Sequence, residues 1–370
     1  MSIIYLENQY QINSKELAQI DQASDIPYLS QVDKSLQAAL KFAWQWLRGK
    51  DGFEQATSGS TSTPKVIRLH RDQMITSARM TLQALGLGKK DSALLCLHAQ
   101  YIGGKMMIVR SLLADMDIVF IRPTSNPLSY LPFLPTFAAM VPLQIQTLLE
   151  GGKASQLNLM SAIIVGGAPI SATLEKQISE QLTIPVYNTY GMTETVSHIA
   201  LRKLTPPNVS DVFQVLDKTQ IALDERGCLK IKGKVTRDQW LVTNDLVEIE
   251  NDNSFRWLGR YDSVINSGGV KVMPEQIEKV LEPILQAQNY ISRFLVSSLL
   301  DEKLGERIVL ILECDTLSKS FEKRILGQAA QRLSKYQLPK AIYYLPKFSE
   351  TSTNKIKRRQ TQRLLLQSLA

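Results

Sequence analysis

Apolar and polar positions alternate in a regular rhythm between residues 92 and 198. Four short apolar runs are separated by longer segments with helical periodicity. The runs span residues 93–97, 118–121, 162–165 and 185–188, and the helical segments span residues 105–114, 136–150 and 172–181. Strand and helix in turn predict an α/β fold, with a mostly parallel sheet that helices cover on both faces.

The rhythm changes after residue 198. Short strand-like runs at residues 228–232, 240–242, 247–250 and 255–258, separated by Asn and Asp turns, predict a small antiparallel region. The last third predicts helices at residues 274–285 and 321–335 and strands at residues 294–298 and 308–313. We therefore expect a large domain of residues 1–259 and a small α+β domain of residues 260–370.

The composition is that of an ordinary globular protein. The chain has 370 residues, of which 44% are apolar and 21% charged, enough for two or three domains that each bury a core. This excludes a disordered tail and a disulfide-stapled scaffold. Three cysteines without a CxxC pair fit a reducing compartment. With no export signal and no apolar run of about 20 residues, we expect a cytoplasmic protein without membrane insertion.

The net charge of +8 is unevenly distributed. Residues 263–370 carry 17 Lys and Arg against 10 Asp and Glu. A basic lobe beside a near-neutral body suits an anionic ligand that binds between them, and a solvated basic surface explains the excess equally well. The basic run Lys355, Lys357, Arg358 and Arg359 has no interleaved aromatic residues for stacking on bases. We therefore expect no nucleic acid partner.

A run of hydroxyl and glycine residues precedes Lys65. Its members are Thr57, Ser58, Gly59, Ser60, Thr61, Ser62 and Thr63, followed by Pro64. The backbone N–H groups and hydroxyls of such a loop can surround phosphate oxygens while the lysine adds positive charge. It is not a Walker A motif, because Pro64 stands where that motif requires glycine. On composition alone, a solvated Ser/Thr loop explains the run equally well.

Two further loops follow predicted strands, at the sheet edge where ligands of such folds bind. One contains Gly166, Gly167 and Ala168, and the other contains Tyr190, Gly191, Thr193 and Glu194. In the second loop the carboxylate could coordinate Mg²⁺ while the hydroxyl holds a phosphate oxygen, or both residues could belong to a helix N-terminus. The tyrosine ring either offers a flat face to a purine or packs in the core.

Asp245 is a candidate for binding a ribose. It follows Thr243 in an expected exposed turn, where a carboxylate can accept hydrogen bonds from both ribose hydroxyls or form an ordinary Asx turn. The histidines His70, His98 and His198 are widely separated and have no metal-ligand spacing.

Five motifs, in one order along the chain, resemble those of the adenylate-forming superfamily, which includes acyl-CoA synthetases, firefly luciferases and peptide-synthetase adenylation domains. They are TSGST with PK at residues 57–65, YGMTE at 190–194, WLVTND at 240–245, GRYD at 259–262 and NKIKR at 354–358. The resemblance implies an adenylate-forming ligase fold with a large AMP-binding domain and a small mobile C-terminal lid. It also implies ATP, Mg²⁺, CoA and a small-molecule carboxylic acid as ligands.

The resemblance also implies roles for single residues. Lys355, Thr193 and Glu194 are the implied catalytic residues, with Glu194 as the Mg²⁺ ligand. Arg260 would reach the ribose, and Asp262 would be the hinge about which the lid rotates. The implied ATP and AMP site further contains Thr57, Ser58, Gly59, Ser60, Thr61, Lys65, Gly166, Gly167, Ala168, Tyr190, Gly191 and Asp245.

Within this superfamily, two stretches resemble the o-succinylbenzoate:CoA ligase family of menaquinone biosynthesis. They are YGMTETVSH at residues 190–198 and VINSGGVK at residues 264–271. The resemblance implies that Gly268, Gly269 and Lys271 belong to the CoA or acyl site. His98 or Tyr101 would line the acyl pocket, although a core packing role explains either residue equally well.

The chain departs from the superfamily pattern in two ways. Ser62, Asn244 and Asn354 stand where the motifs usually carry glycine, and the first motif begins at residue 57, much earlier than is common. The first departure keeps open a catalytically silent ATP-binding homologue. Another aryl- or acyl-CoA ligase, with the same adenylation chemistry, is a second alternative. The second suggests an abbreviated N-terminal region, for which we expect homo-oligomerisation to cover exposed sheet surface.

Overall fold

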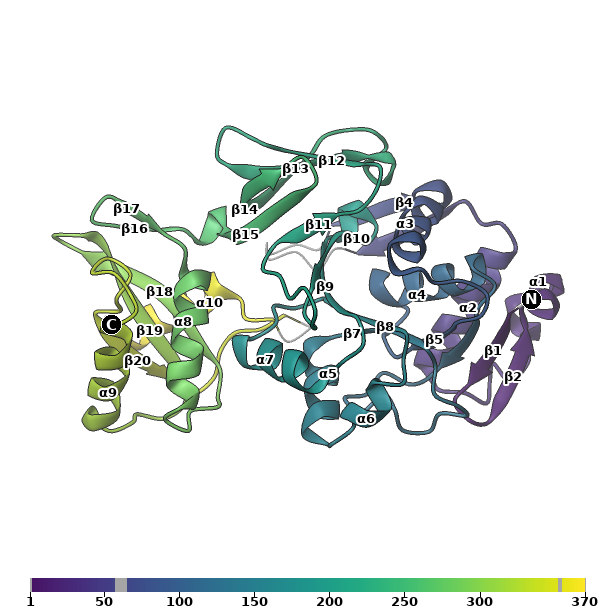
Figure 1. Cartoon of the computed structure of the whole chain (residues 1–370), viewed down its shortest axis with the longest axis horizontal. Helices are drawn as coiled ribbons and strands as arrows, with labels where there is room; N and C mark the ends of the chain where they lie inside the picture. Colours follow the sequence, from purple (N-terminus) through teal and green to yellow (C-terminus); the bar gives the residue numbers. More distant parts are fainter. Residues whose placement is uncertain (1, 57–64, 352–354, 370) are drawn as a thin grey trace.

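The computed structural model describes residues 2–56, 65–351 and 355–369. Two large sheets form separate parts of the molecule, one from the N-terminal two thirds of the chain and one from the C-terminal third (Figure 1). Each part has its own apolar clusters. No helix within the described ranges is long and apolar enough to cross a membrane.

The N-terminal sheet is parallel in one half and antiparallel in the other. In spatial order its strands are β12 (Thr219–Leu223), β13 (Cys228–Gly233), β14 (Leu241–Asn251), β15 (Ser254–Arg260), β11 (Phe213–Val215), β10 (His198–Lys203), β9 (Val186–Gly191), β8 (Ala162–Val165), β7 (Phe137–Met140), β5 (Ser92–Leu95), β6 (Asp117–Phe120), β1 (Ile3–Leu6) and β2 (Tyr10–Asn13). The strands from β9 to β1 in this order are parallel to one another. The predicted α/β fold is confirmed.

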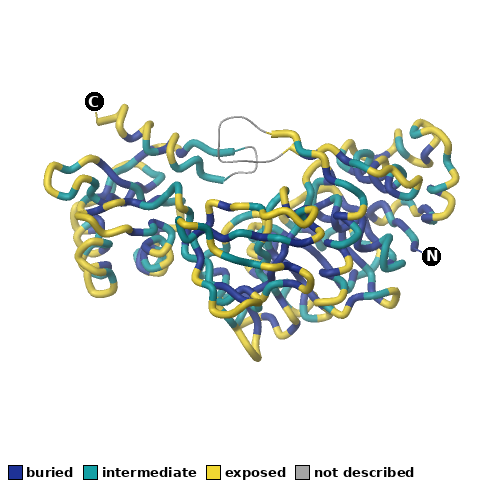
Figure 2. Tube along the Cα trace, turned by 90° about the horizontal axis from the view of Figure 1, so that it is seen from above, coloured by how far each residue is buried: buried dark blue, intermediate teal, exposed yellow. Residues whose placement is uncertain are grey.

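Helices cover both faces of the parallel half, because successive side chains of a strand point to opposite faces. In β5, Ala93 and Leu95 belong to one buried cluster, whereas Leu94 belongs to the other. The helices of the first cluster are α1 (Ser14–Gln19), α2 (Lys34–Leu47), α3 (Arg71–Leu85) and α4 (Ile102–Leu113), and those of the second are α5 (Pro142–Glu150), α6 (Ala154–Leu157) and α7 (Ala172–Gln181). Figure 2 shows the buried segments at the centre of this part.

A separate two-stranded sheet and the C-terminal sheet complete the structure. A separate hairpin pairs β3 (Gly52–Ala56) with β4 (Val66–His70). The C-terminal sheet contains β17 (Val270–Val272), β16 (Ile265–Ser267), β19 (Gly305–Glu313), β18 (Phe294–Asp301) and β20 (Ala341–Leu345). Its apolar clusters involve α8 (Pro274–Gln286) and α9 (Lys319–Ala330) on one face and α10 (Arg358–Leu369) on the other.

Two expectations from the sequence about elements are wrong. The helix expected at residues 136–150 begins only at Pro142, because Phe137–Met140 is a fully buried strand between β5 and β8. The two strands expected at residues 240–242 and 247–250 are one strand, β14, with a register shift between Leu246 and Val247. The predicted antiparallel region is present, and it continues the same sheet through β10.

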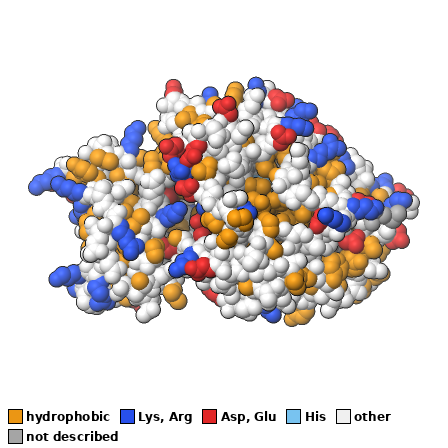
Figure 3. Space-filling view, in the orientation of Figure 1, with side chains coloured by type: hydrophobic (Ala, Val, Ile, Leu, Met, Phe, Trp, Pro, Cys, Tyr) orange, Lys and Arg blue, Asp and Glu red, His pale blue; other side chains and the backbone are white. Residues whose placement is uncertain are grey.

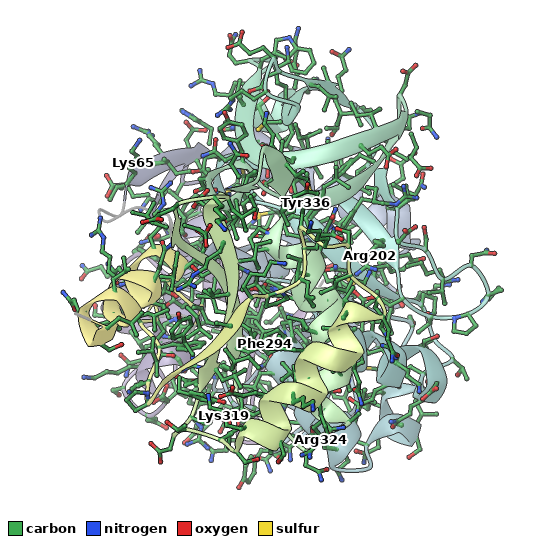
Figure 4. All side chains as sticks on the ribbon, turned by 90° about the vertical axis from the view of Figure 1, so that its left-hand side faces the viewer. Lys65, Arg202, Phe294, Lys319, Arg324 and Tyr336 are labelled. Atoms are coloured by element: carbon green, nitrogen blue, oxygen red, sulfur yellow. The ribbon has the colours of Figure 1, made fainter. Side chains whose placement is uncertain are left out.

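The two parts of the molecule touch through α7 and α8. The backbone N–H of Ala172 at the start of α7 donates a 2.7 Å hydrogen bond to Oε2 of Glu282 in α8, and the side chains of Thr173 and Gln286 are also hydrogen-bonded. Figure 4 views the molecule from the C-terminal side, with Lys319 and Arg324 on α9 toward the viewer and Lys65 on the N-terminal part. The C-terminal part therefore lies against the carboxyl-edge loops of the parallel sheet.

Candidate functional site

Asp245 is the centre of a polar cluster that joins β9 of the parallel half of the large sheet to β14 and β15 of the antiparallel half. Its Oδ2 accepts a 2.8 Å hydrogen bond from the hydroxyl of Tyr190, and its Oδ1 accepts a 3.3 Å bond from Nε1 of Trp257. The Arg260 guanidinium lies 3.7 Å from Oδ1. Burial and then the charge of Asp245 raise the pKa of Tyr190 well above 10. The expected exposed turn at Asp245 is wrong, because the residue is buried within β14.

Strand pairing places Arg260 next to this cluster. Asp245 in β14 lies directly opposite Arg260, the last residue of β15. Nε of Arg260 also donates a 3.0 Å hydrogen bond to Asp262, in the short helical turn Tyr261–Ser263 that leads into the C-terminal part. Burial alone would raise the pKa of Asp262, but the hydrogen bond and charge of Arg260 outweigh it and lower that pKa.

The turn-like stretch before Asp245 is held by Arg226, which the sequence analysis did not identify. Its guanidinium donates 3.1 Å hydrogen bonds to the carbonyl of Thr243 and to Oδ1 of Asn244. The same group lies 4.9 Å from the centre of the Tyr261 ring. Asn244 stands where the motif usually carries glycine, and its side chain therefore helps to fix this segment.

Two glycines allow close approach at the carboxyl edge of the sheet. A Cβ atom on Gly166 would lie 2.1 Å from Oγ1 of Thr189 in β9. A Cβ atom on Gly191 would lie 2.4 Å from both the Ser197 carbonyl oxygen and Cα of His198. Gly167 has a left-handed φ of 83°, which suits glycine better than other residues. These loops therefore need glycine for packing and backbone geometry, apart from any role in binding phosphates.

The segment after Gly191 is a strained turn. Thr193 and Glu194 begin a short 3₁₀ turn, with Glu194 exposed at its surface. Val196 has a φ of 67°, and the N–H of Ser197 donates a 2.7 Å hydrogen bond to the carbonyl of Thr195. This is a γ-turn of the rare positive-φ form. A β-branched residue in this conformation is a marker of strain, which clusters at functional sites.

Glu194 fits a Mg²⁺ ion that is held mainly by a substrate. Within residues 2–56, 65–351 and 355–369, no group of three or more His, Cys, Asp or Glu side chains could hold a metal ion. Mg²⁺ in nucleotide enzymes is commonly bound through one or two carboxylates together with phosphate oxygens and water. A single exposed carboxylate next to Thr193 matches that donor set.

Lys355 comes from the C-terminal part. Its backbone N–H donates a 3.1 Å hydrogen bond to Oγ1 of Thr351, and the neighbouring Ile356 forms an antiparallel bridge with Glu350. Burial lowers the pKa of Lys355 below its usual value. None of the contacts described joins Lys355 to the Asp245 cluster.

The remaining predicted positions lie apart from one another. Lys65 is exposed at the start of the segment leading into β4, and the predicted residues Thr57, Ser58, Gly59, Ser60 and Thr61 fall outside the described residues. Gly268 and Gly269 turn the β16–β17 hairpin, where Gly268 packs against Tyr336. Lys271 is exposed on β17, and His98 lines a pocket beside β3 and β4. The described contacts do not join His98 to this C-terminal hairpin.

Arg110 is a second residue that the sequence analysis did not identify. It is 1% exposed in α4, where its NH2 donates a 2.7 Å hydrogen bond to Oγ of Ser197, while its Nε has no partner among the described residues. Burial lowers the pKa of Arg110 to about 9, so the group remains charged at pH 7. The signal in the sequence was one charged residue in the apolar run MMIVRSLL.

His198 lies beside this arginine and is buried in its neutral form. Its Nε2 is 3.0 Å from Oγ1 of Thr81, and its Nδ1 is 3.4 Å from Oγ of Ser197. Burial and then the charge of Arg110 lower the pKa of His198 well below 6.5. The guanidinium therefore lies directly behind the Gly191–Ser197 turn with only neutral neighbours among these side chains.

Comparison with known proteins relates the chain to AMP-forming enzymes. The AMP-binding enzyme family model matches residues 55–233. A crystal structure from Dyadobacter fermentans, named an acyl-CoA synthetase (AMP-forming)/AMP-acid ligase II-like protein, is 40% identical. The match covers 95% of this chain and 99% of that chain, with a TM-score of 0.60.

Proteins with a named acid substrate are more distant. The 2-succinylbenzoate–CoA ligase of Bacillus cytotoxicus is 26% identical over 345 residues, which cover 84% of this chain and 69% of the relative. The structure of O-succinylbenzoate coenzyme A synthetase from Bacillus subtilis, in complex with ATP and magnesium ion, is 22% identical and has a TM-score of 0.71. That match covers 84% of this chain and 69% of the other chain, and it shows the shared fold.

Proposed function

The chain belongs to the AMP-binding enzyme family, that of the AMP-forming acyl-CoA synthetases, and we propose that it ligates o-succinylbenzoate to CoA, a step of menaquinone biosynthesis. In the first step the acid's carboxylate attacks the α-phosphorus of ATP, which gives an acyl adenylate and releases pyrophosphate. In the second step the CoA thiol attacks the acyl carbon and displaces AMP. The names of relatives such as the Bacillus cytotoxicus ligase support this choice of acid.

The observation that carries the nucleotide half of the proposal is the cluster around Asp245. A carboxylate that already accepts hydrogen bonds from Tyr190 and Trp257 keeps further lone-pair sites for two ribose hydroxyls. Because both neighbours hold it in place, little conformational freedom is lost when the ribose binds. Arg260 beside it would donate to the ribose as well.

We assign the phosphate positions to the loops at the carboxyl edge of the sheet. Thr193 would donate to an α-phosphate oxygen, and the backbone around Gly166, Gly167 and Ala168 would line the nucleotide. Glu194 would hold Mg²⁺, which neutralises charge on the phosphates when it is bound. Lys65 would add positive charge to the phosphate loop at residues 57–61, whose role stays a prediction.

We assign the transfer step to Lys355. A lysine can contact the attacking carboxylate and the α-phosphate together and so offset the charge that accumulates between them. The lid would swing about Asp262 after the adenylate forms, since Arg260, Asp262 and the following glycine hairpin link the two parts of the molecule. This movement would remove Lys355 and admit CoA.

The buried guanidinium of Arg110 supports an acid with a second carboxylate. A charged group with no acid partner among the described residues is unfavourable in an apolar interior. A ligand carboxylate that reached it past the Gly191–Ser197 turn would form a charge-assisted, bidentate pair. o-Succinylbenzoate offers one carboxylate for activation and one for this pairing.

The setting of the reaction is part of the proposal. Cys96, Cys228 and Cys314 are free thiols, which supports a reducing, cytoplasmic compartment. We also propose that the protein forms a homo-oligomer. Light scattering of the purified protein tests this point, and a strictly monomeric mass would contradict it.

The reaction is tested by measuring AMP release with ATP, Mg²⁺ and CoA. Purified protein is supplied with o-succinylbenzoate, benzoate, a medium-chain fatty acid or no acid. AMP and a CoA thioester formed only with o-succinylbenzoate is the expected result. Turnover with another acid of the panel would show that the proposed reaction is right and the proposed substrate is wrong. No AMP with any acid would favour a catalytically silent homologue.

A further inference from the structure

A pocket of about 670 Å³ lies beside the β3–β4 hairpin, and the roles assigned above use none of its cationic side chains. These are Lys41 from α2, Lys50 before β3, Arg68 from β4 and Lys105 from α4. Among the described residues that line the pocket, Glu54 supplies the one carboxylate. Lys and Arg side chains also gather on the right-hand side of the face in Figure 3, where Figure 1 draws α2, α3 and β4.

One of the cations is held in place by neutral groups, and a second lies over a glycine. Nζ of Lys105 donates a 2.8 Å hydrogen bond to Oε1 of Gln55 and a 3.2 Å bond to the carbonyl of Glu54. The Arg68 side chain lies directly over Gly52, where a Cβ atom would be only 2.5 Å from its Nε. Position is therefore fixed at Lys105 without any loss of positive charge.

The floor of the pocket is aromatic. Nζ of Lys105 lies 5.9 Å from the ring centre of Phe42, and Nζ of Lys50 lies 5.5 Å from that of Phe53. Burial and then the charge of Lys50 lower the pKa of Lys105. The lysines therefore repel one another over an apolar surface, which strengthens their attraction for an anion.

The four cations have no ion pair with any carboxylate in the described part of the chain. Four positive charges against one negative charge leave a concave site that favours a multiply charged anion. Phosphate groups suit it better than a single carboxylate, because each offers several oxygens to lysine ammonium groups and a bidentate edge to arginine.

We propose that this pocket binds a phosphate-bearing anion of the reaction, either released pyrophosphate or the 3′-phosphorylated nucleotide end of CoA. The choice between these two compounds rests on the proposed function, whereas the existence of the anion site does not. The hairpin of β3 and β4 lines the pocket with Gly52, Phe53, Glu54 and Arg68, so an anion held there would not occupy the Asp245 cluster.

Binding is measured by calorimetry with the full chain, without any acid substrate. Pyrophosphate and adenosine 3′,5′-bisphosphate are titrated separately, each in the presence of saturating AMP. The test variant combines Lys41→Glu with Lys50→Glu, since both side chains are exposed and their reversal should not affect folding. The control combines Lys303→Glu with Lys323→Glu, which makes the same change in net charge on exposed positions of the C-terminal part.

We expect the affinity for at least one of the two anions to fall roughly tenfold or more in the test variant and to change less than about twofold in the control. Loss of adenosine 3′,5′-bisphosphate binding identifies the CoA end. Loss of pyrophosphate binding identifies pyrophosphate. If neither anion binds, or if both variants lose affinity equally, the proposal is wrong. Because no acid is needed, this result is independent of whether o-succinylbenzoate is the substrate.

Discussion

The hydroxyl of Tyr190 donates a 2.8 Å hydrogen bond to the carboxylate of Asp245 across a sequence separation of 55 residues. Tyr190 lies near the end of β9 in the parallel half of the large sheet, and Asp245 lies in β14 of the antiparallel half. The bond therefore fixes the orientation of the proposed ribose acceptor from the opposite side of the site.

Tyr190→Phe removes this bond and leaves the ring in place. We expect the KM for ATP to rise about tenfold, since a hydrogen bond to a charged group contributes about 1.5–3 kcal/mol. The KM values for the acid and for CoA should change little. Tyr187→Phe, an equal loss of one hydroxyl on the same strand, is the control, and a similar rise in both variants would contradict the special role of Tyr190.

Lys355→Ala separates the two half-reactions. We expect adenylate formation to slow by about 10²–10³-fold, the usual cost of removing one donor that stabilises developing charge. Thioester formation from supplied acyl adenylate should stay near the wild-type rate. Lys357→Ala, which removes a neighbouring charge, should spare both steps. If Lys355→Ala slows both half-reactions equally, the role assigned to Lys355 in adenylate formation is wrong.

The protonation of Lys355 predicts a pH dependence of the first half-reaction. Burial lowers the pKa of this lysine from 10.5, and only the protonated form carries the charge that the step needs. Adenylation by the wild type should therefore decline as the pH rises through this lowered pKa. The pH profile of Lys355→Ala, measured in single turnover, should lack that alkaline limb.

The sequence was sufficient for the elements whose pattern is local. The run at residues 162–165 and the helix at residues 172–181 agree with β8 and α7 because burial and periodicity point to the same structure there. Residues 137–140 were assigned to a helix because a buried strand and a buried helical turn are both continuously apolar. Only the neighbours β5 and β8 decide between them.

The site was predictable only as far as its motifs extend. Tyr190, Asp245 and Arg260 were identified from motifs, whereas Arg226, Trp257 and Arg110 lie outside them and enter the site through strand pairing and helix packing. Asp245 was placed in an exposed turn because TND is rich in turn-forming residues. Pairing with Arg260 instead draws it into β14, where it is buried.

Gly191→Ala tests the close packing behind the proposed phosphate turn. The added Cβ would lie 2.4 Å from backbone atoms of Ser197 and His198, which cannot move aside as a flexible side chain could. We expect the free energy of unfolding to fall by about 3 kcal/mol and adenylation to be lost. Urea unfolding and AMP release measure the two effects.

Gly327→Ala is the matched control for that substitution. Gly327 lies within α9, and a Cβ atom there would meet nothing within 4 Å. Alanine in a helix interior should raise the free energy of unfolding by about 0.5–1 kcal/mol, with unchanged turnover. Unaltered stability of Gly191→Ala would show that the turn can relax and that its packing is not tight.

Arg110→Met tests whether the buried guanidinium is kept for a ligand. Removing a charge that has no acid partner among the described residues should stabilise the free protein by about 1–4 kcal/mol. The same change should lower kcat/KM for o-succinylbenzoate by about 100-fold, because the second carboxylate loses its charge-assisted pair. The melting temperature should rise with o-succinylbenzoate in the wild type and not in the variant, whereas both should respond to ATP.

The stability gain of Arg110→Met should also depend on pH in a defined direction. The pKa of Arg110 in the folded protein is about 9, which is lower than in the unfolded chain. Above pH 9 the unfolded state therefore binds more protons than the folded state does. Wild-type stability therefore increases relative to Arg110→Met above that pH, and the stability advantage of Arg110→Met should become smaller between pH 7 and 10.

Arg202→Met is the opposite control, because Arg202 is paired with Glu175 and its loss leaves a carboxylate without its partner. Arg202→Met should destabilise the protein at pH 7, and a destabilised Arg110→Met with an unchanged kcat/KM would assign Arg110 a purely structural role.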